Sequence, residues 1–388
     1  MPKIARRVET LRASLFSTLA RRLEGYEGKR YPFHIGDHAH APPEAARLGT
    51  VDVTRLGNPY RYGHPSGEPA LRAALAEKLV RQNGLRWVTA DHVQIGSGAT
   101  HCVSATLQAL TDPGDEVLLP SPYWPLSRGI IQCVGGVAVE VPLYQRLLED
   151  PGLDVRRTLE ASVGPRTRMI YLITPNNPNG LVLDERALEA VADVARRHDL
   201  WVLSDEAYET TAFARPHVSI AILAGMADRT VSVFTFSKTY ALAGLRIGYL
   251  AAPGGAARDA IGKVATHSVY NTAQAIQSAA LAAIEHGAPF IDQCQQGFAA
   301  AAELVRERLR APFHAAQGGS YVFVDLRRYG PDAMPILERL ASRGVTLAPG
   351  AIFGKGYEGY ARLCYTATDR ETLAEGLELI NAELARPT

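Results

Sequence analysis

The chain has 388 residues, of which 47% are hydrophobic and 21% are charged, as in an ordinary globular protein. This length predicts about two domains. The formal net charge is +1 and the Lys and Arg residues are scattered, which argues against a nucleic-acid-binding surface. There is also no run of about 18 uncharged apolar residues, the length that would predict a membrane span.

The N-terminal segment has an amphipathic pattern. Leu11, Leu15, Leu19 and Leu23 share one stripe, which predicts a helix that lies on the body of the protein. Acidic residues within the segment argue against a transit peptide, which would lack them.

The spacing of the cysteines bears on their redox state and on the cellular compartment of the protein. All four lie far apart and form no CxxC pair, so we expect buried, reduced thiols in a cytoplasmic protein. They are Cys102, Cys133, Cys294 and Cys364.

From about residue 68 the pattern alternates helices with strands. The expected elements are a helix over 68–83, a strand over 92–95, a Gly-rich turn with a helix to 110, strands over 116–119, 137–141 and 168–174, a helix over 184–198, and strands over 200–204, 230–236 and 246–252. Because these strands are almost continuously apolar, they predict a mostly parallel sheet that is covered on both faces.

The last hundred residues have a different order of elements. The pattern predicts helices over 291–309 and 332–343 and from 372, with strands over 320–325 and 360–365. This order is typical of a smaller α+β unit. The chain contains no internal repeat and no low-complexity linker.

Four polar motifs each follow an expected strand. They are GSGAT (96–100), TPNNPNG (174–180), SDEAYE (204–209) and SKTY (237–240). Ligands of α/β proteins bind where strands end, so we expect these motifs to meet in one cleft.

The GSGAT motif presents backbone N–H groups at a helix N-terminus, which suits an anion. A dinucleotide fingerprint would need glycine at position 101, where His101 stands, and the lysine of a triphosphate-binding loop is missing. The loop therefore suits a single phosphate, although a purely structural turn explains it equally well.

Two charged residues lie in apolar surroundings. Asp205 ends an apolar strand, where its carboxylate either meets a cation or caps the next helix. Lys238 stands in the apolar run FSKTYALAGLRIGY, where it is either a desolvated nucleophile or a surface lysine with a buried stem. Pyridoxal phosphate meets these demands together, because it offers an aldehyde to the lysine, a phosphate to the glycine loop and a ring nitrogen to the aspartate.

From about residue 31 to residue 384 the order of these motifs resembles the class I and II aminotransferases, which are fold-type I pyridoxal-phosphate enzymes. The resemblance implies an α/β fold, with a large domain built on a mostly parallel seven-stranded sheet and a smaller α+β domain. We expect the large domain to span 48–285, and the small domain to combine 1–47 with 286–388.

The resemblance implies three catalytic residues. Lys238 matches the lysine that forms a Schiff base with the cofactor, Asp205 the partner of the ring nitrogen, and Tyr208 a donor to the phenolic oxygen. Arg246 matches the arginine that binds the phosphate, and Thr235 stands where a hydroxyl assists it.

Further matches complete the expected cofactor site. Asn177 in NNPNG matches a second donor to the phenolic oxygen, and residues 98–100 match the phosphate loop. In SPYW, Trp124 rather than Tyr123 is expected to stack on the ring, unless it only packs in the core. Tyr62, in YRYGHPSGEPALRAAL, matches a tyrosine that reaches the neighbouring subunit's phosphate. The resemblance therefore implies a homodimer with shared active sites. The residues of the expected phosphate loop are Gly98, Ala99 and Thr100.

Substrate contacts are expected from both ends of the chain. Arg362 in GYARLCYT matches the arginine that binds the substrate α-carboxylate, and Asn177 and Trp124 are expected beside it. Gly36, in HIGDHAHAPP, fits a turn that touches the substrate, but His38 replaces the usual proline. His38 is therefore a candidate contact to the substrate side chain.

The histidines of this loop also raise the question of a metal. His34, His38 and His40 are loosely spaced and show no supporting ligand, so we expect a polar entrance loop and no metal.

The implied activity is transfer of the α-amino group of an L-amino acid to a 2-oxo acid by a ping-pong mechanism. Because THSVYNTAQ (266–274) supplies no Lys or Arg for a second carboxylate, neutral or aromatic donors are favoured. A lyase or cyclase with the same cofactor is the alternative, since sequence does not fix which bond breaks. A ligand-sensing regulator is disfavoured because only about 30 residues precede the fold, and a nicotinamide dehydrogenase because of the incomplete glycine motif.

Overall fold

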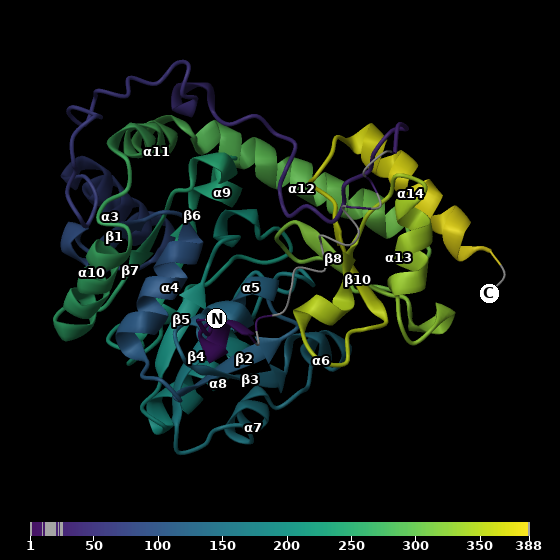
Figure 1. Cartoon of the computed structure of the whole chain (residues 1–388), viewed down its shortest axis with the longest axis horizontal. Coiled ribbons are helices and arrows are strands. Elements are labelled where there is room, and N and C mark those ends of the chain that lie inside the picture. The colour runs from purple at the N-terminus through teal and green to yellow at the C-terminus, as the bar shows by residue number, and fades with distance from the viewer. Residues whose placement is uncertain (1, 10, 12–20, 22, 24–25, 387–388) are drawn as a thin grey trace.

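The computed structural model describes residues 2–9, 11, 21, 23 and 26–386, and Figure 1 shows their arrangement. One sheet of seven strands forms the larger part of the molecule. In spatial order its strands are β1 (Val93–Gly96), β7 (Gly248–Ala251), β6 (Thr230–Thr235), β5 (Trp201–Asp205), β4 (Thr167–Ile173), β2 (Glu116–Ser121) and β3 (Val137–Pro142).

The sheet is mostly parallel, as expected. Within the described residues only β7 runs against its neighbours, since it pairs antiparallel with both β1 and β6. The other strands run in one direction, and their carboxyl ends lie at one edge of the sheet. The side chains that follow these strands are therefore brought to the same edge.

Helices cover both faces of this sheet because alternate strand residues point to opposite sides. Leu118 and Ile170, both fully buried, pack with α6, α7 and α8, whereas their neighbours Val117 and Met169 pack with α4, α5 and α10. Burial of each such side chain contributes about 1.5–3 kcal/mol. The helices are α3 (Pro69–Asn83), α4 (Ala99–Leu110), α5 (Pro125–Cys133), α6 (Tyr144–Glu149), α7 (Val155–Glu160), α8 (Glu185–Arg197), α9 (Phe236–Thr239), α10 (Ala256–Ser268) and α11 (Gln274–His286).

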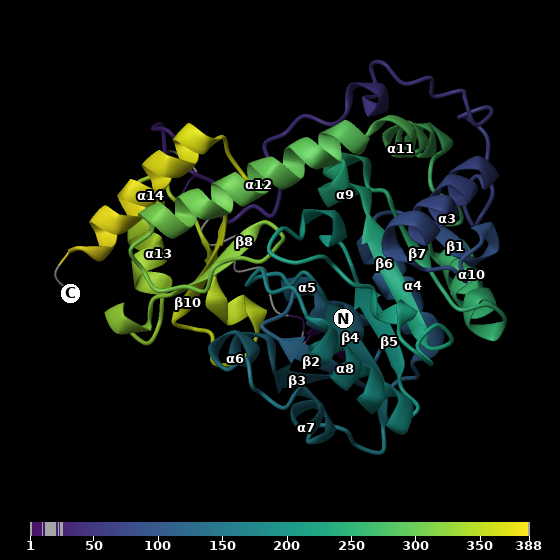
Figure 2. The ribbon, with the colours of Figure 1, turned by 180° about the vertical axis from the view of Figure 1, so that it is seen from behind.

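A second, smaller unit contains a three-stranded antiparallel sheet in the order β8-β10-β9. Figure 2 shows the long helix α12 running from the end of α11, beside the large sheet, across to this unit. Its elements are α12 (Ala288–Arg308), β8 (Tyr321–Asp325), α13 (Met334–Ala341), β9 (Ala348–Pro349), β10 (Tyr360–Cys364) and α14 (Arg370–Leu384).

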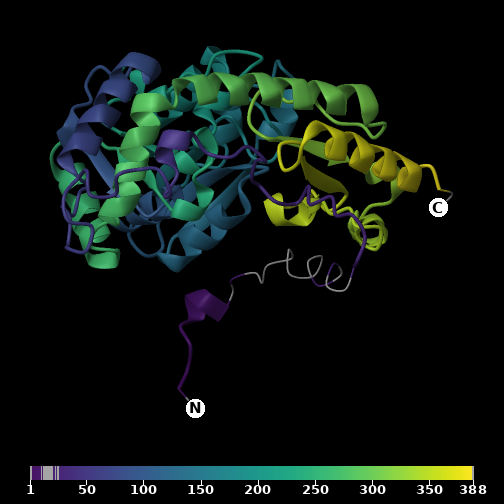
Figure 3. The ribbon, with the colours of Figure 1, turned by 90° about the horizontal axis from the view of Figure 1, so that it is seen from above.

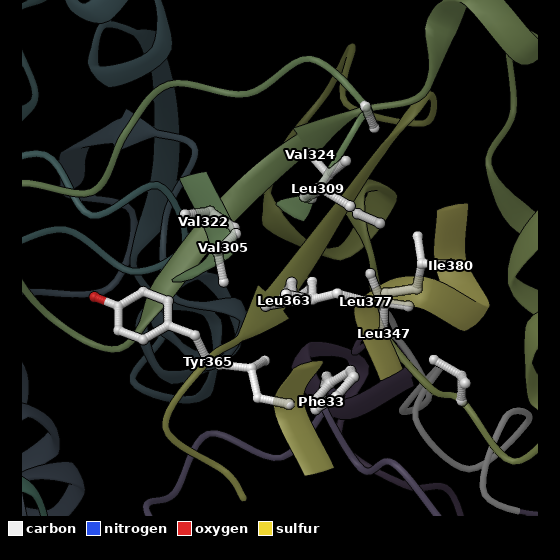
Figure 4. Close-up of a cluster of buried hydrophobic side chains, with 14 of the residues drawn as sticks. Phe33, Val305, Leu309, Val322, Val324, Leu347, Leu363, Tyr365, Leu377 and Ile380 are labelled. Carbon is white, nitrogen blue, oxygen red and sulfur yellow. The ribbon is translucent and has the colours of Figure 1, made fainter. Parts of the chain in front are cut away.

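The smaller unit has its own hydrophobic core, shown in Figure 4. Val322 on β8 and Leu363 on β10 pack in it with Leu377 of α14. Phe33, from the N-terminal part of the chain, is fully buried in the same core. The segment that carries Gly36 and His38 is therefore anchored on the small sheet and then runs back to the large one.

Two further expectations concern the N-terminal segment and the cysteines. Of the N-terminal stripe, Leu15 and Leu19 lie outside the described residues, whereas Leu23 is buried. The helix α1 (Arg6–Glu9), near the N-terminus in Figure 3, contacts α5. The expectation of four buried thiols was wrong for Cys133, which is exposed, whereas the other cysteines are buried. Cys133 ends α5 two residues after the buried Ile131, and residues two apart on a helix face different sides.

No helix in the described part of the chain combines the length and the apolar character that crossing a membrane requires.

Candidate active site

A cavity of about 480 Å³ opens at the edge where β4, β5 and β6 end, a volume typical of small-molecule sites. All four motifs that follow strands contribute to its wall. The residues that line it include Ala99, Thr100, Trp124, Asn177, Asp205, Tyr208, Thr235, Lys238, Arg246 and, from the smaller unit and the N-terminal segment, Gly36, Tyr321 and Arg362.

Lys238 stands just beyond β6, on the short helix α9. Thr235 caps this helix, because its side chain accepts a hydrogen bond from the Ser237 N–H at 3.1 Å. Lys238 Nζ points into the cavity and donates to the carbonyl oxygen of Gly36. Burial lowers the pKa of this amine; Asp37 and Cys364 oppose the effect, and Arg362 and Arg246 add to it. A lysine with a lowered pKa is a better nucleophile and base at neutral pH.

Asp205 is the last residue of β5 and is only 6% exposed. One carboxylate oxygen accepts a hydrogen bond from the Tyr171 hydroxyl and the other accepts from the Ala207 N–H, both at 3.2 Å. Burial raises the pKa of Asp205 to about 6, and the adjacent Glu206 adds to the effect. A carboxylate held in this way pairs well with a cationic ring nitrogen.

An anion-binding corner lies at the N-terminus of α4. Gly98 caps this helix with φ at 78°, a conformation that favours glycine, and Ala99 and Thr100 begin the helix. A Cβ atom at Gly98 would lie 2.5 Å from Arg246 Nη2, so the missing side chain lets the guanidinium approach the loop. The helix N-terminus and the arginine together suit a phosphate.

Arg362, on β10 of the smaller unit, faces the same cavity and is 4% exposed. Its Nη1 donates to Asn177 Oδ1 at 2.9 Å and its Nη2 donates to the His34 carbonyl at 2.8 Å. Its Nε is buried without a hydrogen-bond partner among the described residues. The guanidinium is thus fixed in orientation and retains a donor for an incoming carboxylate.

The aromatic residues of SPYW take different positions. Trp124 lines the cavity, directly before α5. Tyr123 is 1% exposed, and its hydroxyl donates to Glu140 at 2.9 Å. Trp124 is therefore the one placed where a ring could stack.

Three of the expected site residues do not line the cavity wall, and one of them, Gly98, only precedes the wall residue Ala99. His38 packs edge-on against Phe298, with ring centroids 5.4 Å apart, and does not line the described cavity wall. The chain carries it past the cavity toward α12. Tyr62 is 85% exposed and its ring contacts Tyr270, so within one subunit it contributes nothing to the wall. Among the described residues no group of three His, Cys, Asp or Glu side chains is placed to hold a metal.

Several residues of the cavity wall were not predicted from the sequence. Ser237 could have been predicted, because it adjoins Lys238 in the SKTY motif. Ile35 and Leu126 are apolar and half exposed at the wall, and Tyr321 begins a strand of the other sheet. A search for polar motifs at the ends of parallel strands does not identify apolar wall residues or a residue of the other sheet.

The cavity fits pyridoxal phosphate by the chemistry of its donors. It offers a lysine of lowered pKa to an aldehyde, a helix N-terminus with an arginine to a phosphate, and a buried aspartate to a ring nitrogen. Arg362 is not needed to bind the cofactor and is free to bind a substrate carboxylate.

Comparison with known proteins agrees with this chemistry. Residues 32–380 match the family model for aminotransferase class I and II. The chain is 32% identical to the aspartate/prephenate aminotransferase of Thermus thermophilus, with both chains fully covered, and 32% identical to aromatic-amino-acid aminotransferase 2 of Thermococcus litoralis over 96% of each. The structure of a Thermus thermophilus aspartate aminotransferase double mutant superposes with a TM-score of 0.90 at 30% identity, covering 99% of this chain and 100% of that chain.

The chain therefore belongs to the class I and II aminotransferases, of fold type I. It is an enzyme that transfers an amino group between an amino acid and a 2-oxo acid, and its cofactor is pyridoxal 5'-phosphate.

Proposed function

We propose that this aminotransferase works by a ping-pong mechanism, in which donor and acceptor use the same site in turn. Three cationic groups line the described part of the cavity, namely Lys238, Arg246 and Arg362. Since the first two are assigned to the cofactor, Arg362 alone remains for a substrate carboxylate. The oxo acid made from the donor must then leave before the acceptor binds, and this observation carries the proposal.

The cofactor supplies an aldehyde and a ring that accepts electrons. In our proposal Lys238 would hold the cofactor at its aldehyde carbon, while Arg246 and the loop 98–100 would bind its phosphate beside Thr235. Asp205 holds a proton on the ring nitrogen. Tyr208 and Asn177 donate to the phenolic oxygen, and Trp124 covers the ring.

The chain's own groups then move the proton. Arg362 and Gly36 orient the amino acid, and Lys238 Nζ, once displaced, takes the proton from the substrate Cα and later returns it. The lowered pKa of Lys238 supports this role, because a larger fraction of the amine is unprotonated at neutral pH than for an ordinary lysine. The relatives named above transfer amino groups, which favours this outcome over elimination or cyclisation.

We further propose that the donors are neutral or aromatic amino acids. Ile35 and Leu126 add apolar surface to the wall, and His34 beside them has its pKa lowered to about 4 by burial, so it is uncharged at neutral pH. An acidic side chain would need a further cation. Residues 266–274, which we expect to lie near the partner's site, include no Lys or Arg.

The active enzyme is proposed to be a homodimer in which Tyr62 completes the neighbouring subunit's phosphate site. Tyr60, Tyr62 and Tyr270 are large apolar residues exposed by 95%, 85% and 46%, as expected for a surface that a partner covers. The proposed large domain spans 48–285 and the small domain 1–47 with 286–388. The separate hydrophobic core of the smaller unit supports this division.

The test of the mechanism mixes enzyme and donor without an acceptor. We expect one 2-oxo acid per bound cofactor and then no further turnover until pyruvate or 2-oxoglutarate is added. Continuous release of ammonia from the donor alone would instead identify a lyase. For specificity, kcat/KM for phenylalanine and leucine should exceed that for aspartate at least about tenfold, since a buried carboxylate without a cation is costly.

A further inference from the structure

Tyr321, the first residue of β8, touches two groups of the site at once. It is 1% exposed, and its hydroxyl oxygen lies 2.8 Å from that of Tyr208. The guanidinium of Arg362 lies over its ring, with Cζ 4.3 Å from the ring centroid. One side chain of the smaller sheet thus joins a residue assigned to the cofactor with the residue assigned to the substrate.

The direction of the hydroxyl contact follows from counting protons. A tyrosine hydroxyl has one proton to donate and can also accept. If Tyr208 gives its proton to the cofactor, the proton between the two tyrosines must come from Tyr321. Burial raises the pKa of Tyr321 to about 12 and that of Tyr208 well above its ordinary value, so both hydroxyls keep their protons at neutral pH.

The ring of Tyr321 is also held in place. A Cβ atom at Gly36 would lie 2.5 Å from the Tyr321 hydroxyl oxygen, so the absence of a side chain at Gly36 leaves room for that hydroxyl. The rings of Tyr208 and Tyr321 meet edge to face, with centroids 5.7 Å apart. Phe353 lies on Arg362 as well, its ring centroid 5.1 Å from Cζ.

We propose that Tyr321 is a positioning residue with two separable parts: its hydroxyl donates to Tyr208 and strengthens the bond that Tyr208 gives to the cofactor, and its ring holds Arg362 ready for the substrate carboxylate. This inference rests on the roles proposed above for Tyr208 and Arg362. A hydrogen bond donated to a hydroxyl oxygen makes that hydroxyl a better donor. A cation over an aromatic face is stabilised by the ring.

The hydroxyl is tested with Tyr321→Phe, which keeps the ring. The readout is the pH titration of the visible absorbance of the bound cofactor. Because the variant weakens the bond from Tyr208 that stabilises the deprotonated phenolic oxygen, the titration midpoint should rise by about half to one pH unit. Tyr365→Phe is the matched control, since it removes another buried hydroxyl bond of the same unit, to the Gly319 carbonyl at 2.8 Å, without touching the cavity. Its midpoint should not move.

The ring is tested with Tyr321→Leu and Tyr321→Met. The readout is the calorimetric affinity for 3-phenylpropionate, a carboxylate that has no amino group and cannot react. Both variants should bind it about threefold to thirtyfold more weakly, whereas Tyr321→Phe should stay within about twofold of wild type. Equal affinity in all four proteins would overturn the role of the ring.

A double variant tests whether the Tyr321 hydroxyl acts through Tyr208. In a Tyr208→Phe background, adding Tyr321→Phe should cause no further change of midpoint, because the hydroxyl acts through Tyr208. A full additional rise would overturn the inference, as would an unchanged midpoint in Tyr321→Phe alone. If wild-type protein itself gives no pH-dependent visible absorbance with pyridoxal phosphate, the cofactor-site assignment fails rather than the role of Tyr321.

Discussion

Arg362 and Asn177 join the two sheets of the enzyme at the site itself. Arg362 Nη1, on β10 of the smaller sheet, donates to Asn177 Oδ1, in the loop after β4 of the larger sheet, at 2.9 Å. Both residues are at least nine-tenths buried. The guanidinium is therefore oriented before any substrate arrives, which lowers the cost of binding a carboxylate.

Arg362→Lys should raise the KM for amino donors about tenfold to a hundredfold. Lysine keeps the positive charge but has one ammonium in place of the planar fork, so it cannot serve Asn177, the His34 carbonyl and a carboxylate together. Steady-state kinetics with phenylalanine measure the change. Arg328→Lys, at an exposed position, is the control, and an unchanged KM in Arg362→Lys would remove this residue from substrate binding.

Lys238→Ala should lower turnover by at least about a thousandfold, because it removes both the covalent hold on the cofactor and the base. The protein should still bind pyridoxal phosphate through Arg246 and the helix N-terminus, but its visible spectrum should resemble that of the free aldehyde. Lys263→Ala changes an exposed lysine on α10 and should behave as wild type. Activity near the wild-type value in Lys238→Ala would contradict the assignment.

Asp205→Asn should bind the cofactor yet slow proton removal from the substrate by about a hundredfold or more. The amide fills the same space but carries no charge to keep a proton on the ring nitrogen. Exchange of the donor Cα proton with D₂O, followed by NMR, measures this step. Asp193→Asn on the surface of α8 is the control. Normal exchange in Asp205→Asn would argue against its role at the ring nitrogen.

Much of this site was predictable because it lies at the ends of parallel strands. Asn177 and Lys238 follow β4 and β6, and Asp205 ends β5; these strands are apolar and easily recognised. Once their common direction is inferred, the polar residues behind them must gather at one edge. The family resemblance then assigned a chemistry to each residue.

Other features have no local signal. The helices α6 and α7 have six residues each, too short for a clear period, and α11 is buried on several sides, so its pattern shows no single stripe. The reversed direction of β7 leaves no trace in its composition. The surroundings of Tyr321 and His38 depend on where the N-terminal segment lies. Gly36 of that segment meets Tyr321, and His38 meets Phe298, so both contacts join residues far apart in the sequence.

The buried His38 gives a prediction for stability in acid. Burial lowers its pKa to about 4, with the nearby Lys238 and His40 adding to the effect and Asp37 opposing it. Between about pH 6.5 and 4 the unfolded chain therefore binds a proton that the folded chain does not. Stability rises with pH across this window and is lost as the pH falls through it, by about 3 kcal/mol for this group.

His38→Gln should remove this dependence while leaving the fold intact. The free energy of unfolding in urea, measured on apoprotein at pH 7 and pH 4.5, should fall less in the variant than in wild type, by about 1–3 kcal/mol. The raised pKa of Asp205 acts in the opposite direction in both proteins and cancels from the difference. His198→Gln, at an exposed position, should keep the wild-type slope, and the same slope in His38→Gln would show that His38 is protonated in the folded state above pH 4.5.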